Sequence, residues 1–141
     1  MKYIFIDTNV IIDFLSDRQP FSDDAAILFQ LAKEKKIKIF VSAISFNNTY
    51  YVLRKYTSHQ QVLKLLIQLE KYICVQAIDG EILRSALISN FKDFEDAIQY
   101  YSALKVGEID VITTRNLKDF RNSDLPVLSP QTTIKYLLNN F

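Results

Sequence analysis

Three short polar segments hold the side chains of this sequence that are best suited to chemistry. They are Asp7–Asn9, Asp93–Asp96 and Thr114–Asp119, and each contains at least one carboxylate. Carboxylate oxygens are the protein ligands that Mg²⁺ and Mn²⁺ favour. The three segments would therefore form an oxygen-lined metal site if the fold brings them to one place.

Other metal chemistry is nearly excluded by the composition. The chain has one His and one Cys, whereas a zinc site needs three or four such ligands. Cys74 lies in an apolar run and is expected to pack as a small hydrophobic residue. His59 is expected in the exposed first turn of a helix, as a surface residue rather than a catalytic base. Because the formal net charge is only +1, any binding of nucleic acid must come from a local basic patch.

Asp7 directly follows a run of β-favouring residues that ends at Ile6. This pattern predicts a buried strand with Asp7 at its carboxyl end, followed by a helix capped by Thr8 or Asn9. In an open parallel sheet, ligands bind in the crevice outside the carboxyl ends of the strands. Two interpretations of Asp7 stay open here: it binds a cation, or it does no more than cap the next helix.

Strand-like and helix-like segments alternate along the rest of the chain. Further strands are predicted at residues 37–42, 72–78, 110–114 and, for a short fifth strand, 126–128. The N-caps predicted for the helices between and after them are Ser22, Ser58, Asp79, Asp93 and Ser129. This alternation favours parallel strands joined by right-handed crossovers. The predicted fold is a three-layer α/β/α sandwich around a central, mostly parallel sheet.

The chain is expected to form a single domain over residues 1–141. Two Gly and three Pro leave little material for a linker, and the length is sufficient to bury a proper core. The N-terminus does not resemble a signal peptide, because the first apolar run is short and ends at Asp7. No apolar stretch approaches the ~20 residues of a membrane span. We therefore expect a cytoplasmic protein without a membrane partner.

Together, the three polar segments and their flanks resemble a PIN domain. The matching stretches are Ile4–Val10, Asp93–Ala97 and Ile112–Asn116, with Lys118–Phe120 following the last one. An Asp-Thr-Asn triplet is common by itself, but the three blocks in this order and at this chain length are fairly specific. In detail they are similar to the small toxin-type ribonucleases of the VapC kind, over essentially the whole chain.

The resemblance implies a cluster of three or four carboxylates that holds Mg²⁺ or Mn²⁺ for phosphodiester hydrolysis. Asp7 and Asp96 match two of the family's acids and are the expected metal ligands. The family's Glu corresponds here to Asn48, and its acid after the late strand corresponds to Asn116, so two negative charges are missing. Asp119, slightly further along, could supply a replacement carboxylate, and Asp93 is also near.

Hydroxyl and basic side chains complete the expected site. Thr8 and Thr114 are expected to donate hydrogen bonds to a substrate phosphate or to water on the metal. Five basic side chains could flank the cleft and bind RNA phosphates without reading the sequence. They are Arg54, Lys55, Arg115, Lys118 and Arg121.

The function that the resemblance implies is that of a metal-dependent endoribonuclease, the toxin of a toxin–antitoxin pair. RNA would be its substrate, a small antitoxin protein its partner, and a homodimer its usual state. The neutral residues Asn48 and Asn116 leave an alternative open, a catalytically weakened PIN-like module that binds RNA or a partner. A phosphatase with Asp7 as nucleophile ranks low, because Asn9 stands where such an enzyme needs a second acid as general acid.

Overall fold

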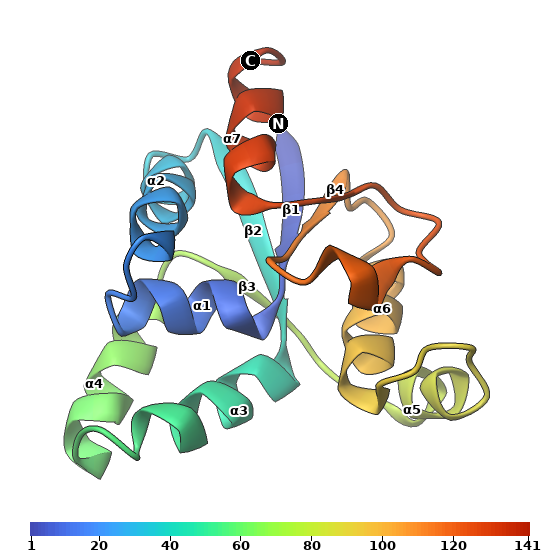
Figure 1. The fold of residues 1–141 in the computed structure, drawn as a ribbon, viewed down its shortest axis with the longest axis horizontal. Helices are drawn as coiled ribbons and strands as arrows, with labels where there is room; N and C mark the ends of the chain where they lie inside the picture. The colour runs from blue at the N-terminus through green and yellow to red at the C-terminus, as the bar shows by residue number, and fades with distance from the viewer.

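A computed structural model describes the whole chain, Met1–Phe141, and its centre is a five-stranded sheet (Figure 1). The strands are β1 (Lys2–Ile6), β2 (Ile37–Ser42), β3 (Cys74–Gln76), β4 (Val111–Thr113) and β5 (Val127–Leu128). They lie in the order β3-β2-β1-β4-β5, and every neighbouring pair is parallel. The direction of winding reverses between β1 and β4, which is where open α/β sheets bind ligands.

Seven α-helices and one short 3₁₀ helix connect and cover the strands. They are α1 (Thr8–Leu15), α2 (Phe21–Lys33), α3 (Ala43–Leu53), α4 (His59–Glu70), α5 (Gly80–Leu87), α6 (Phe94–Val106), η1 (Leu117–Phe120) and α7 (Pro130–Leu138). In Figure 1, α1, α2 and α7 lie on one side of the sheet, and α5 and α6 lie on the other. The predicted three-layer α/β/α sandwich is confirmed. None of the helices is long and apolar enough to cross a membrane.

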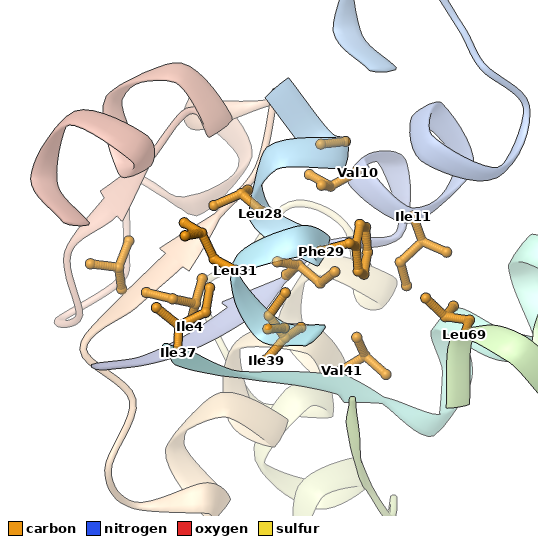
Figure 2. Close-up of a cluster of buried hydrophobic side chains, with 14 of the residues drawn as sticks. Ile4, Val10, Ile11, Leu28, Phe29, Leu31, Ile37, Ile39, Val41 and Leu69 are labelled. Atoms are coloured by element: carbon orange, nitrogen blue, oxygen red, sulfur yellow. The ribbon is translucent and has the colours of Figure 1, made fainter. Parts of the chain in front are cut away.

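Successive side chains of the strands point into two separate core layers. Ile4 and Ile6 of β1 belong to the larger cluster, with α1, α2, α4 and α7 (Figure 2). Phe5, between them, packs with Ile112 of β4 and Tyr100 of α6 on the opposite face. Each fully buried side chain of this size stabilises the fold by about 1.5–3 kcal/mol. The two layers therefore pack against β1 from both faces. This packing fixes the position of Asp7, the residue that follows β1.

Element boundaries agree with the sequence-based predictions in most places. β2 has the predicted bounds, and the side chains of four predicted caps accept a first-turn N–H: Ser58, Asp79, Asp93 and Ser129. The third and fourth strands are shorter than predicted, because only three residues of each are in the sheet. The Ser22 cap is wrong, because α2 begins at Phe21 directly after Pro20.

Candidate metal-binding site

The carboxyl edge of the sheet brings together residues that are 107 positions apart in the chain. β1 and β4 pair with Ile6 opposite Thr113, and the Asp7 N–H donates to the Thr113 carbonyl at 3.0 Å. Asp7 and Thr114 are the next residues of the two strands. Thr114 Oγ1 donates to Asp7 Oδ2 at 2.8 Å, so the register of the sheet sets this contact.

Asp7 is also the N-cap of α1, which corrects the predicted caps Thr8 and Asn9. Its backbone is extended (φ −77°, ψ 158°), and Oδ1 accepts the Thr8 N–H at 2.7 Å. Asn9 lies within the helix, and its Nδ2 donates to Asp7 Oδ2 at 3.3 Å and to Thr114 Oγ1 at 3.2 Å. One carboxylate oxygen thus caps the helix, while the other accepts side-chain hydrogen bonds. The capping and cation-binding interpretations of Asp7 are compatible.

Burial raises the pKa of Asp7 from 3.8 to about 6, because only 5% of the residue is exposed to water. The hydrogen bonds from Thr114 and Thr8 lower the pKa, since they stabilise the ionised form. The nearby charges of Glu95 and Asp119 raise it again. A cation at this position would favour the ionised carboxylate and reverse the shift.

Asp96 lies in the first turn of α6, and its pKa is raised to about 7. Burial is the largest cause, and repulsion from Asp7 and Asp93 comes next, with Asp119 and Glu95 adding to it. The Asp96 N–H donates to the capping Asp93 Oδ1 at 3.0 Å, but the Asp96 carboxylate forms no ion pair. Asp96 is therefore a second acid in the electrostatic environment of Asp7.

The other predicted site residues lie on η1 and α3. Asp119 is exposed on η1, and its charge raises the pKa values of both acids described above. Asn116 precedes η1, and its N–H donates to Thr114 Oγ1 at 3.0 Å. Asn48 is half-buried on α3, and its side chain makes no hydrogen bond within the protein. The structure therefore connects Asp119 and Asn116 to the Asp7 environment, whereas Asn48 has no such contact.

A buried polar network next to Asp7 was not predicted. Gln99 Nε2 on α6 donates to Thr8 Oγ1 at 2.9 Å and to Ser45 Oγ at 2.8 Å, and these two hydroxyls lie 2.8 Å apart. Thr8 Oγ1 also donates to Glu95 Oε1 at 3.3 Å. The sequence did hold one signal, because residues 95 and 99 are four apart and share a helix face. Glu95 is thus an unpredicted acid beside the expected ones.

The basic residue nearest to this edge is held by an ion pair. Arg115 was expected to bind RNA phosphates, but its guanidinium donates two hydrogen bonds to the buried Asp13 of α1. The same guanidinium lies 4.0 Å from the centre of the Phe21 ring. Arg115 therefore anchors the segment after β4 to α1. Lys118 and Arg121 are exposed and remain available.

Two polar residues, Asp110 and His59, lie outside this group, and His59 is at the surface as expected from the sequence. Asp110 Oδ2 accepts the Tyr3 N–H at 2.8 Å, near the amino end of β1 and at the opposite edge of the sheet. His59 is exposed at the start of α4, and its Nδ1 shares a hydrogen bond of 2.8 Å with the Tyr50 hydroxyl. Neither residue contacts the acids around Asp7.

The donor set at the carboxyl edge fits a hard divalent cation. All its candidate ligands are oxygens, and no ion pair is formed by the four acids Asp7, Glu95, Asp96 and Asp119. No three His, Cys, Asp or Glu side chains are arranged to hold a metal ion by themselves. Mg²⁺ commonly uses one or two carboxylates and completes its shell with water and substrate phosphate. The site fits that kind of binding.

Comparison with known proteins identifies the family of this chain. The model of the PIN domain family matches residues 3–118, and the chain belongs to this family. Ribonuclease VapC1 of Aquifex aeolicus (strain VF5) is 24% identical over 139 residues, covering 91% of this chain and 90% of the relative. The resemblance to VapC-type ribonucleases is thereby confirmed.

Solved structures of similar fold include a toxin–antitoxin complex and a toxin. A toxin–antitoxin complex from Klebsiella pneumoniae matches with a TM-score of 0.65 and 24% identity, over 90% of this chain and 97% of the other. Mycobacterium tuberculosis VapC20, described as a sarcin–ricin loop-cleaving toxin, matches with a TM-score of 0.61 and 19% identity. That match covers 77% of this chain and 86% of the other.

Proposed function

We propose that this protein is a divalent-metal-dependent endoribonuclease that hydrolyses RNA phosphodiester bonds and acts as the toxin of a toxin–antitoxin pair. The observation that carries the proposal is the group of acids without basic partners at the carboxyl edge of the sheet, led by Asp7 and Asp96. Membership of the PIN domain family and the similarity to a ribonuclease support it.

In this proposal Asp7 and Asp96 hold Mg²⁺ or Mn²⁺. When bound, such an ion supplies Lewis-acid activation of water and of the scissile phosphate. Thr114 keeps the Asp7 carboxylate in one orientation through its 2.8 Å hydrogen bond. Because Asn48 and Asn116 are neutral, a substrate phosphate must complete the coordination, and the affinity for metal is weak without RNA.

Two further residues on η1 have roles in the same proposal. Asp119 supplies the carboxylate that Asn116 lacks, because its charge already reaches Asp7 and Asp96. Lys118 is exposed on the same short helix and binds the RNA backbone, which positions the strand without reading its sequence.

A cleavage assay on single-stranded RNA tests the function. The purified protein should cleave RNA with Mn²⁺ or Mg²⁺ and not with EDTA. Asp7→Asn and Asp96→Asn should each reduce the rate by about a hundredfold or more, because metal activation contributes several kcal/mol. Glu108→Gln is the control, since Glu108 is exposed and lies near the opposite edge of the sheet. Equal cleavage by wild type and Asp7→Asn would indicate a contaminating nuclease and overturn the proposal.

The partner in this proposal is a small antitoxin protein. We infer that it covers the apolar groove between α1, α2 and α4, a hollow of about 370 Å³ whose lining includes Phe14, Phe29, Leu65 and Tyr72. A complex from Klebsiella pneumoniae with the same fold is described as toxin–antitoxin. Co-expression with the small protein encoded by a neighbouring gene should give a stable complex, and Leu65→Glu should prevent it. Without that partner, we propose that the protein is a cytoplasmic homodimer. Light scattering of the purified protein tests the dimer.

Asn48 and Asn116 favour one alternative, a catalytically weakened module that binds RNA or a partner. That alternative predicts no metal-dependent cleavage by the wild-type protein. It also predicts that RNA binding, measured by fluorescence anisotropy, is unchanged in Asp7→Asn. The same purified variants therefore separate the two functions.

A further inference from the structure

We propose that Glu95 is a further acid of the metal site, supplying from α6 the negative charge that Asn48 does not supply from α3. A buried network of three side chains, Gln99, Ser45 and Thr8, holds it in place. The inference rests on the proposed metal-dependent function and adds a residue to the site. Within that function, Glu95 contributes its charge beside the two ligands and is not one member of a closed three-ligand cage.

Glu95 is placed among the acids by its position in the first turn of α6. It is half-buried between Asp93, which caps the helix, and Asp96. Its Oε1 accepts a hydrogen bond from Thr8 Oγ1 at 3.3 Å, and Thr8 directly follows Asp7. Its Oε2 accepts no hydrogen bond from the protein, and Glu95 forms no ion pair. The charge of Glu95 is therefore fixed beside Asp7 and left without a counter-charge.

The network next to Glu95 has a defined direction. Gln99 Nε2 has two hydrogens, and it donates to both Thr8 Oγ1 and Ser45 Oγ. Thr8 Oγ1 donates to Glu95 Oε1, so the single hydroxyl hydrogen of Thr8 points to Glu95. Ser45 must then donate its own hydrogen to Thr8 across 2.8 Å. The hydrogen bonds therefore run in one direction, from Gln99 through Ser45 and Thr8 to the Glu95 carboxylate, and they hold this carboxylate against Thr8.

Gln99 is an unusual choice for a purely structural role. Its side chain is completely buried, and its Oε1 has no hydrogen-bond partner. An unpaired buried carbonyl destabilises a fold, whereas an apolar side chain of similar shape does not. The donor side of the amide is the part that is used, and both of its hydrogens go to the network that ends at Glu95. This asymmetry favours a role in positioning.

The same network explains why Glu95 can stand in for an acid on α3. Ser45 and Asn48 are three residues apart and so lie on the same side of α3. Ser45 contacts both Thr8 of α1 and Gln99 of α6, so α3 and α6 meet at Thr8. A carboxylate delivered by either helix would reach this region.

Calorimetric titration with Mn²⁺ alone tests the role of Glu95 without measuring activity. Glu95→Gln should weaken Mn²⁺ binding about tenfold, in the range found when partners of metal ligands are removed. Glu95→Asp keeps the charge and should lose less. Glu108→Gln makes the same chemical change on an exposed residue just beyond the other end of α6, and it should bind Mn²⁺ as wild type does.

A double-mutant cycle tests the positioning role of the network. Thr8→Val is nearly isosteric and removes the hydroxyl that contacts Glu95, so it should also weaken Mn²⁺ binding, while Thr8→Ser should restore it. In the Glu95→Gln background, Thr8→Val should have no further effect on Mn²⁺ affinity, because Thr8 acts through Glu95. A purely structural role would give additive losses instead. Circular dichroism confirms that each variant is folded.

The outcomes separate this inference from the proposed function. If Asp7→Asn abolishes Mn²⁺ binding while Glu95→Gln stays within twofold of wild type, only the role of Glu95 is refuted. If Glu95→Gln weakens binding but the two substitutions are additive, the network does not position Glu95, and that part is refuted. If the wild-type protein binds no Mn²⁺ with or without RNA, both the inference and the metal-dependent function are wrong.

Discussion

Replacing Asp7 by Asn should change how the stability of the fold depends on pH. Folding raises the pKa of the Asp7 carboxyl, mainly by burial, from 3.8 to about 6. The folded state therefore binds this proton more tightly than the unfolded state does. For such a group the stabilisation is complete below pH 3.8 and is lost as the pH rises through about 6. Asn does not titrate, so the variant should lack this loss.

The expected magnitude follows from the shift and from the hydrogen bonds of Asp7. A shift of about two pKa units corresponds to about 3 kcal/mol of lost stability at pH 7.5. In Asn an NH2 group replaces the Oδ2 that accepts hydrogen bonds from Thr114 and Asn9, and each lost hydrogen bond costs about 1 kcal/mol. We therefore expect Asp7→Asn to be about 2 kcal/mol less stable than wild type at pH 4. At pH 7.5 it should be about 1 kcal/mol more stable.

The variant should thus change from less stable to more stable than wild type as the pH rises. Urea denaturation in EDTA, followed by circular dichroism between pH 4 and pH 8, measures this change. The urea dependence of the unfolding free energy should be the same for both proteins. Glu108→Gln is the control and should follow wild type at every pH, since Glu108 is exposed and makes no ion pair. If the unfolding free energies of wild type and Asp7→Asn depend on pH in the same way, the reasoning that burial raises the pKa of Asp7 is refuted.

The same measurement with Mn²⁺ connects stability to the proposed site. A ligand at a hundred times its Kd stabilises the folded state by about 2.7 kcal/mol. Wild type at pH 7.5 should gain about that amount in Mn²⁺, and Asp7→Asn should gain almost none. An equal gain in both proteins would mean that Mn²⁺ binds somewhere else.

Three further substitutions have defined outcomes. Asp119→Asn should reduce metal-dependent RNA cleavage about as strongly as Asp96→Asn if Asp119 replaces the missing late acid, and a mild loss in the cleavage assay would leave a site of two carboxylates. Asn48→Glu should tighten Mn²⁺ binding in calorimetry by restoring a charge on α3, and an unchanged affinity would place residue 48 away from the metal. Asp13→Asn should lower the unfolding free energy by about 3 kcal/mol in urea denaturation, because it leaves Arg115 without its buried partner; a loss below about 1 kcal/mol would contradict that role.

The fold could be predicted from the sequence because its local signals agree with one another. Alternation of apolar residues marked β2 with its observed bounds, and Ser58, Asp79, Asp93 and Ser129 marked helix starts by their capping chemistry. Ser22 failed as a cap because the chain enters α2 from Pro20, and its hydroxyl donates to Asp17 instead. A side chain that can cap does so only where its own backbone is extended, whereas Ser22 is already within the helix, and the sequence does not show this difference.

The site was harder to predict, because its contacts depend on register and on packing between helices. Asp7 could be placed at a strand end, but its contact with Thr114 depends on the pairing of Ile6 with Thr113. The Gln99 network joins three helices that are distant in the chain, and no local pattern announces such a contact. From the sequence, Arg115 was predicted to bind RNA phosphates. Only the tertiary structure shows that its guanidinium forms an ion pair with Asp13.

The helix ends around the site explain how its acids are tolerated without a cation. Asp7 caps α1, and Asp96 lies in the first turn of α6, so both carboxylates are near the positive end of a helix dipole. Each such placement stabilises an ionised acid by about 0.3–1 kcal/mol. Burial acts in the opposite direction and is the largest effect for Asp7, whose net pKa shift corresponds to about 3 kcal/mol at neutral pH. The helices thus reduce the electrostatic penalty without removing it. A divalent cation bound at this edge would relieve the remaining penalty, so cation binding and the stability of this edge should rise together.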